Sequence, residues 1–216
     1  MSERLRRLSS TSWLRLLAVA CIVAGLSLIL ATAYQIWDPG AAREQHKLAT
    51  QLQHQWQRHT TGHGYQQIAL VTGQPFAFLR IPALGPHWRF AVVEGTSLPQ
   101  LALGPGHVPG TQLPGEPGNF AVAAHDITSG NPFLHLASLR HGASIYVTTV
   151  NGTYKYRVLS ESVVRYTDVG MLAPVPGHPG QHAAGQFITL ISCTPVSLAF
   201  TPWRVVVTGT LAGSPG

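Results

Sequence analysis

The sequence predicts an all-β domain, a closed or nearly closed barrel of eight short strands, joined to an N-terminal membrane helix. Short apolar runs separated by turns fill the chain beyond residue 76, and most of the 22 glycines and 16 prolines lie beyond residue 60. Such runs are typical of strands in β-barrels and sandwiches. Apolar residues make up 45% of the 216 residues, which is enough for a core and argues against global disorder.

The membrane helix is predicted from Leu16–Tyr34, nineteen residues without a charge. A helix needs about 20 such residues to span a bilayer. Trp13 and Trp37 flank the segment, as aromatic residues do at membrane interfaces. Four arginines and one glutamate precede it, so the N-terminus is expected to stay in the cytoplasm and the rest of the chain to be exported.

Two other interpretations of this segment are open. A signal peptide could be cleaved after Ala31-Thr32-Ala33, although the apolar run exceeds the roughly 7–15 residues of a signal-peptide core. A lipidated N-terminus at Cys21 would need a shorter apolar run before the cysteine. We therefore expect a retained single-pass anchor in the cell membrane.

Four segments are predicted along the chain. They are a basic cytoplasmic tail at 1–15, a transmembrane signal anchor at 16–37, a juxtamembrane stalk and linker at 38–64, and an extracytoplasmic domain at 65–216.

The stalk is expected to contain a short helix. Leu48, Leu52 and Trp56 are spaced four apart, which predicts a helix over residues 41–58 that packs weakly on the domain. The histidines of the stalk could suggest a metal site, but a solvated polar stalk explains them more simply. Residues 60–64 are then a linker.

Eight strands are predicted beyond residue 76. The clearest hairpin is indicated by alternating Tyr146, Thr148 and Val150, followed by Asn151-Gly152 as a two-residue turn. The expected strands are 76–81, 90–94, 120–124, 144–150, 153–159, 162–165, 187–192 and 204–211.

The charge distribution does not indicate a nucleic-acid partner. The whole chain carries +6, but beyond residue 60 seven Lys/Arg face five Asp/Glu, which leaves +2 on the folded part. The basic balance therefore reflects membrane topology. Gly104-Pro105-Gly106 is expected to be a turn and not a dinucleotide fingerprint. No cofactor and no metal ion are expected, and no acidic cluster indicates calcium.

Cys193 is the candidate nucleophile. It ends the apolar run 187–192, where a rigid strand can present a reactive group, and Cys21 in the apolar segment cannot pair with it. A buried, inert cysteine is the alternative. Export makes that alternative less attractive, because a free thiol outside the cell is exposed to oxidation. From chemistry alone the two interpretations are about equally good.

A nucleophilic cysteine needs a proton partner and a donor for the oxyanion. Seven histidines lie beyond residue 64, and His125 alone directly follows an apolar strand, 120–124, which could fix its geometry. Arg204 begins the last predicted strand, eleven residues after Cys193. A guanidinium can offer two donors to one oxygen and keeps its charge. Taken alone, a water-facing arginine at a strand edge is the better interpretation.

Together these residues resemble the sortase family. The sortase signature T-L-x-T-C is similar to Thr189-Leu190-Ile191-Ser192-Cys193, with His125 upstream and Arg204 downstream. The runs Gly104–His107 and Gly118–Val122 are similar to the actinobacterial class E group. The resemblance covers residues 80–211, most of the exported chain.

Three positions depart from the family pattern. Ser192 stands where the motif has threonine, and Ala124 and Asp126 flank His125 where class E members usually carry glycine and a basic residue. Asp126 could raise the pKa of His125 through its charge. These departures affect the subclass and the substrate motif more than the chemistry.

The resemblance implies the eight-stranded sortase β-barrel and a cysteine transpeptidase. Cys193, His125 and Arg204 would be catalytic, and Ser192, Thr189 and Ala124 would contact the substrate. The substrate would be an exported protein with a C-terminal sorting signal, LAxTG-like or LPxTG-like, cleaved between Thr and Gly through a thioester. The acceptor would be an amine of a lipid-linked peptidoglycan precursor, or a pilin lysine.

Two other functions are open at this point. A cysteine peptidase would use the same residues, with water taking the acyl group. A catalytically weak, sortase-like binding module would carry an inert Cys193.

Overall fold

The computed structural model describes residues 3–36, 39–59, 66–194 and 200–213. The chain divides into two compact units, Met1–Trp37 and Asp38–Gly216. The first contains α1 (Glu3–Ile36), in which Trp13–Ala33 has a mean hydropathy of 2.6 and no buried side chain. This helix is long and apolar enough to cross a membrane and is consistent with a single-pass anchor, although a signal sequence has the same properties.

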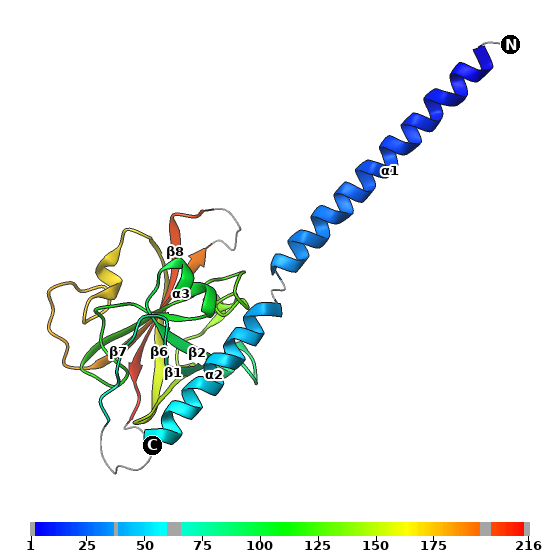
Figure 1. Cartoon of the computed structure of the whole chain (residues 1–216). Coiled ribbons are helices and arrows are strands. Elements are labelled where there is room, and N and C mark those ends of the chain that lie inside the picture. The colour runs from blue at the N-terminus through cyan, green and yellow to red at the C-terminus, as the bar shows by residue number, and fades with distance from the viewer. Residues whose placement is uncertain (1–2, 37–38, 60–65, 195–199, 214–216) are drawn as a thin grey trace. The chain divides into compact units, whose positions relative to one another are not determined.

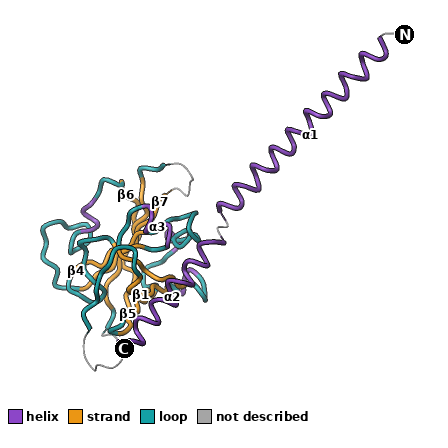
Figure 2. Tube along the Cα trace, in the orientation of Figure 1, coloured by secondary structure: helices purple, strands orange, loops and turns teal. Residues whose placement is uncertain are grey.

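The second unit is a closed β-barrel with the strand order β1-β2-β3-β4-β7-β8-β6-β5. Figures 1 and 2 show the strands gathered around one core, with long loops outside them. Two neighbouring pairs, β2–β3 and β4–β7, are parallel, and the other pairs are antiparallel. The strands are β1 (Pro75–Arg80), β2 (Arg89–Glu94), β3 (Gly106–His107), β4 (Gly118–Ala123), β5 (Ser144–Thr149), β6 (Gly152–Arg165), β7 (Gln186–Thr194) and β8 (Trp203–Leu211).

Helices of the second unit lie outside the barrel wall or in the connections. They are α2 (Pro39–His59), η1 (Pro82–Leu84), α3 (Leu98–Leu103), η2 (Leu136–Ser138) and η3 (Val169–Leu172).

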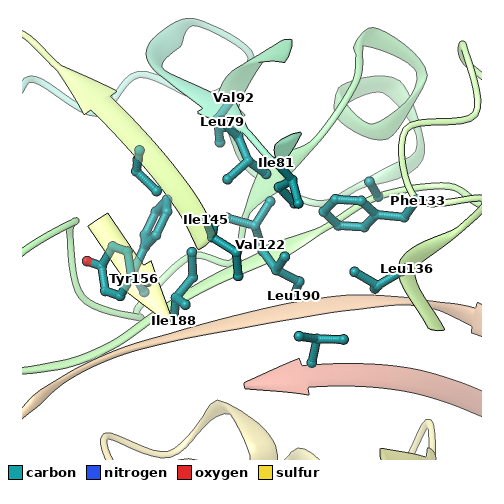
Figure 3. Close-up of a cluster of buried hydrophobic side chains, with 14 of the residues drawn as sticks. Leu79, Ile81, Val92, Val122, Phe133, Leu136, Ile145, Tyr156, Ile188 and Leu190 are labelled. Atoms are coloured by element: carbon teal, nitrogen blue, oxygen red, sulfur yellow. The ribbon is translucent and has the colours of Figure 1, made fainter. Parts of the chain in front are cut away.

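Alternate residues of each strand fill the barrel. In β5, Ile145, Val147 and Thr149 are buried while the residues between them are more exposed. Figure 3 shows such side chains meeting in the core, including the fully buried ring of Tyr156. The Tyr156 hydroxyl accepts a hydrogen bond from the Gly115 N–H at 2.8 Å, so its polar end is satisfied.

The predicted all-β barrel is confirmed, but its eight strands are not the eight expected. The segments 153–159 and 162–165 form one strand, β6, with an irregular register between Val158 and Ser160. This bulge inserts Leu159 and resets the alternation, which is why the sequence pattern breaks there. Gly106, expected in a turn, instead begins the short strand β3 with His107, and this strand pairs with β2 and β4.

The predicted β5–β6 hairpin is confirmed with a register shifted by one residue. Thr149 pairs with Gly152, so Val150 and Asn151 form the turn and Gly152 begins β6. Gly152 has φ +122°, a region that favours glycine. The Asn151 side chain is used elsewhere, because it accepts from the N–H of Gln66 at 2.7 Å and donates to the Gln66 carbonyl at 2.8 Å.

The helix α2 packs firmly on the barrel, so the expectation of weak packing is wrong. Leu52 is 1% exposed and, with Leu48, contacts a cluster on β1 and β2 that includes Phe78 and Val93. The Gln45 side chain also joins α2 to β2, because its amide oxygen accepts a hydrogen bond from the Ala91 N–H at 2.7 Å. The predicted helix is therefore part of the folded unit. The predicted linker, residues 60–64, lies outside the described residues.

We expect Leu52→Ala to lower the free energy of unfolding of the second unit by about 2–5 kcal/mol, because it leaves a cavity between α2 and β1. Urea titration of the full chain in detergent, followed by tryptophan fluorescence, measures the change. Gln53→Ala on the exposed side of the same helix is the matched control. Equal midpoints for both variants would show that α2 adds nothing to stability.

Candidate active site

Cys193 lies at the end of β7, directly opposite Arg204 at the start of β8. Opposed residues of an antiparallel pair point to the same face, with Cβ atoms about 4.5–5.5 Å apart. Both side chains are half-buried, and the charge of Arg204 acts on the Cys193 thiol. The structure therefore brings the candidate nucleophile and the candidate oxyanion donor together.

His125 follows β4, the other neighbour of β7. The parallel register of these strands runs from Gly118 opposite Gln186 to Ala123 opposite Ile191. The N–H of Ala124 still donates to the Ile191 carbonyl at 3.1 Å, so the ladder continues beyond the end of β4. His125 lies two residues beyond the end of β4, and continuing the same register by two residues would set it opposite Cys193.

These three side chains share the outer face of the barrel wall. Successive residues of a strand point to opposite faces, so residues an even number of positions apart share a face. Each of His125, Cys193 and Arg204 is an odd number of positions from a core residue of its own strand. All three therefore point to the outer face. The core residues on these three strands include Val122, Leu190 and Val205.

Backbone carbonyls hold the Arg204 guanidinium in place. Its Nη1 donates to the carbonyl of Thr201 at 2.7 Å and to that of Trp203 at 2.8 Å. The Thr201 hydroxyl in turn donates to the Thr194 carbonyl at 2.5 Å, which ties the β8 side of this connection to β7. The guanidinium also lies 5.9 Å from the ring centroid of Tyr166. Its direction is therefore set by the fold.

Burial favours the uncharged forms of both candidate catalytic groups. It raises the pKa of the Cys193 thiol, and the nearby Arg204 charge lowers that pKa by a smaller amount. Burial also lowers the pKa of His125, against a smaller raising effect of Asp126. A neutral thiol beside a neutral imidazole is therefore the protonation state that the structure favours at neutral pH.

Asp126 is a second electrostatic influence on this site. Its negative charge raises the pKa of both His125 and Cys193, so it lies close to both. The residue is 5% exposed. One carboxylate oxygen, Oδ1, accepts from the Ile127 N–H at 2.9 Å. The sequence-based expectation that Asp126 raises the pKa of His125 is correct in sign, but burial outweighs it.

The three residues expected to contact substrate are buried instead. Ala124, Ser192 and Thr189 are 5%, 3% and 0% exposed. The Ser192 hydroxyl donates to the Ala124 carbonyl at 2.9 Å, which fastens the end of β7 to the segment that carries His125. The Thr189 hydroxyl donates to Asn119 Oδ1 at 2.8 Å. The Ser192 and Thr189 hydroxyls are therefore used within the protein, and substrate contact by the three residues stays a prediction.

Sequence reasoning missed two residues that support the site. Thr201 anchors the connection before β8, and Asn119 links β4 to β7 and to η3. Asn119 could have been noticed, because a polar residue between Gly118 and the apolar run 120–124 stands out. Nothing around Thr201 in the sequence distinguishes it from a surface threonine.

Within the described ranges, no group of three or more His, Cys, Asp or Glu side chains is arranged to hold a metal ion. The buried pair Glu94–His107, with His107 Nδ1 2.6 Å from Glu94 Oε2, is enclosed by the core and hydrogen-bonded to Thr111 at 2.9 Å. The polar atoms of this pair are hydrogen-bonded within the core, and the pair is separate from the group formed by His125, Cys193 and Arg204.

The family model of the Sortase domain matches residues 79–212. This range includes the whole row of His125, Cys193 and Arg204. The chain belongs to the sortase family. Membership of this family implies a cysteine transpeptidase.

Relatives in the family are class E sortases of Streptomyces coelicolor. Sortase SrtE2 is 32% identical over 88% of this chain and 78% of its own length. Sortase SrtE1 is also 32% identical, over 87% of this chain, and the alignment spans only 54% of the length of SrtE1.

Solved sortase structures share the fold. Sortase E from Streptomyces avermitilis is 36% identical with a TM-score of 0.59, covering 67% of this chain and 93% of that one. The SrtF sortase from Corynebacterium diphtheriae is 26% identical with a TM-score of 0.66, covering 72% of this chain and 93% of that one. The sortase-type barrel predicted from the sequence is confirmed.

We expect the alkylation rate of Cys193 by iodoacetamide to rise with pH, with a midpoint above the ordinary thiol pKa of 9.0. Arg204→Gln should move the midpoint up, because it removes a charge that favours the thiolate. Asp126→Asn should move it down, because it removes a charge that opposes the thiolate. Rates measured by mass spectrometry across the pH range test all three.

A Cys21→Ser background removes the other thiol, and Cys193→Ala in that background should show no labelling. A wild-type midpoint below pH 7 would show instead that a thiolate–imidazolium pair dominates at rest.

Proposed function

We propose that this chain is a membrane-anchored cysteine transpeptidase in which Cys193, His125 and Arg204 act together on a C-terminal sorting signal. The observation that supports this most directly is the pairing of Cys193 with Arg204 across β7 and β8, with His125 two residues beyond the end of β4, the other neighbour of β7. A thiol, a proton carrier and a fixed cation in one row are the groups that acyl transfer requires.

In the first half-reaction, the Cys193 sulfur attacks the carbonyl carbon of the Thr–Gly bond as a thiolate. Arg204 stabilises the oxyanion that develops on the carbonyl oxygen. The C–N bond then breaks, His125 as imidazolium gives its proton to the leaving glycine amine, and a thioester to Cys193 remains.

In the second half-reaction, the amine of the acceptor attacks the thioester carbonyl. His125 takes the proton from this amine, an amide bond forms, and the Cys193 thiolate leaves. This step regenerates the imidazolium. The Cys193 thiolate and the protonated His125 are therefore in the same protonation states at the end of the reaction as at its start. At rest the thiol and the imidazole are both neutral. One proton must therefore pass from the Cys193 sulfur to the His125 ring to form the reactive pair.

The substrates proposed are exported proteins with an LAxTG-like or LPxTG-like signal, and the acceptor is a lipid-linked peptidoglycan-precursor amine or a pilin lysine. The similarity to class E sortases supports the first motif. A peptide ligand is also in keeping with the relatives, because Sortase E1 from Streptomyces coelicolor was crystallised with a tripeptide in its active site. That chain is 31% identical to this one, with a TM-score of 0.59 and coverage of 68% of this chain and 93% of that one.

We propose that α1 holds the catalytic unit at the extracytoplasmic face of the membrane, with the N-terminus in the cytoplasm. An exposed apolar helix preceded by arginines supports this orientation. Lipid-linked acceptors and signals with membrane segments are confined to the same surface. Confinement raises the effective concentration of the reactants without any new contact.

We expect Cys193→Ala to abolish thioester formation with a sorting-signal peptide while leaving the fold intact. His125→Ala should lower kcat/KM by about 10²–10⁴-fold. Arg204→Ala should lower kcat by about 10²–10³-fold, because the oxyanion loses its fixed donor. Fluorescence release from a quenched LAxTG peptide measures turnover, and intact-protein mass spectrometry detects the thioester.

Matched controls are Arg140→Ala and His141→Ala, which change the same residue types at exposed positions. Both should keep full activity. Turnover by purified Cys193→Ala would end the proposal, and near-wild-type rates for Arg204→Ala would remove Arg204 from the mechanism.

The main alternative is a cysteine peptidase that passes the acyl group to water. The half-burial of Cys193 is compatible with it, because water can reach the thioester. With a transpeptidase, adding a glycine-type amine should convert the product from acid to amide, as mass spectrometry would show. Acid as the product at every amine concentration would favour the peptidase. Failure of a thiol reagent to label Cys193 in the folded protein would favour the non-enzymatic binding module.

A further inference from the structure

Asn119 is a fully buried amide at the start of β4, on the same outer face as the candidate active site. Its neighbour Phe120 points into the core, so the Asn119 side chain points outward. It is nevertheless 0% exposed. Its Nδ2 donates to the carbonyls of Met171 at 3.0 Å and Ala173 at 3.1 Å, and its Oδ1 accepts from Thr189 Oγ1 at 2.8 Å.

These partners fix the orientation of the amide. Two backbone carbonyls can only accept, so the nitrogen must face Met171 and Ala173. The Thr189 hydroxyl can then donate to the oxygen. Both donor hydrogens and one acceptor position of the Asn119 side chain are used inside the protein. An isosteric carboxylate in this place would set oxygen against oxygen.

The segment η3 depends on these contacts for its position. None of its residues, Val169–Leu172, is fully buried, and the half-buried Met171 and Leu172 belong to neither buried core cluster. Its local hydrogen bonds organise the turn without docking it. Asp168 accepts from the Gly170 N–H at 3.2 Å, and the Gly170 carbonyl accepts from the Gly177 N–H at 3.0 Å.

Thr189 connects this anchor to the strand that carries the nucleophile. Thr189 and Cys193 are four residues apart on β7 and point to the same face, so they are separated by about 13 Å along the strand. An extended peptide of four residues covers the same length. A sorting peptide that runs back from Cys193 along this face would therefore reach the position of η3.

We propose that Asn119 and Thr189 are positioning residues that hold 169–173 against β4 and β7, and that this η3 latch sets the affinity for the peptide substrate. The inference rests on the proposed function. It gives Thr189, the first residue of the cysteine motif, a role in holding η3, at a distance from the Cys193 sulfur. Releasing the latch should weaken substrate binding and leave bond breaking at Cys193 almost unchanged.

Thr189→Val and Asn119→Asp are the test variants, in the full chain. Thr189→Val removes the hydroxyl that donates to Asn119 Oδ1 at 2.8 Å and lies 3.5 Å from the Met171 carbonyl, so KM for an LAxTG peptide should rise about five- to tenfold. Asn119→Asp should raise KM further, while kcat changes less than about threefold in both. Thr189→Ser keeps the hydroxyl and should restore KM. Amide hydrogen exchange at 169–173 should become faster in the first two variants only.

Thr208→Val is the matched control. Thr208 lies opposite Thr189 on β8, is 7% exposed, and its hydroxyl is hydrogen-bonded to that of Ser160 at 2.8 Å. It should lose stability but keep KM and the exchange rate at 169–173. Equal KM for wild type and Thr189→Val, or faster exchange in Thr208→Val as well, would overturn the latch.

Hydrogen exchange also separates this inference from the function on which it rests. If wild type turns over no sorting peptide, the proposed function fails, and the substrate role of the latch fails with it. Unchanged exchange at 169–173 in Asn119→Asp would reject the latch even if the enzyme is an active sortase. If Asn119→Asp fails to fold, the Thr189→Val and Thr189→Ser pair decides alone.

Discussion

The candidate active site depends on the register of one strand, β7, against its two neighbours. A shift of β7 by one residue would turn Cys193 into the core and place Ser192 or Thr194 on the outer face. The register is held by the core residues Ile188 and Leu190 on one face and by the hydroxyl of Thr189 on the other. Barrel closure adds a further constraint, because β7 pairs on both sides and has no free edge.

The same register explains why the structure favours the neutral forms of Cys193 and His125 over the charged ones. Strand ends leave His125 and Cys193 half-buried, so burial favours the neutral thiol and the neutral imidazole. Arg204 opposes this effect for the thiol, and Asp126 opposes it for the imidazole. Asp126 also disfavours the thiolate. The fold therefore supplies a thiol that resists unwanted reaction, and the reactive pair must form by a proton transfer within the row.

The sequence predicted the fold class better than the construction of the barrel. Cys193, His125 and Arg204 stay a proposed catalytic set, chosen because reactive residue types at strand ends are rare and the cysteine motif is specific. The strands β3 and β6 were mistaken because a two-residue strand has no periodicity and a bulge interrupts it. The firm packing of α2 was underestimated, because Leu48 and Leu52 show which face is apolar but not what that face meets.

The roles of Ser192 and Thr189 show the limit of motif reasoning most clearly. Polar residues beside a nucleophile suggest contacts with substrate, yet both hydroxyls are buried and bonded within the protein. The Ser192 hydroxyl fastens β7 to the segment that carries His125, a hydrogen bond for which serine and threonine both carry the donor. Thr189 is bonded to an asparagine seventy residues earlier, which no local pattern reveals. A sequence motif around a nucleophile can therefore reflect the hydrogen bonds that position the nucleophile as much as those that bind its substrate.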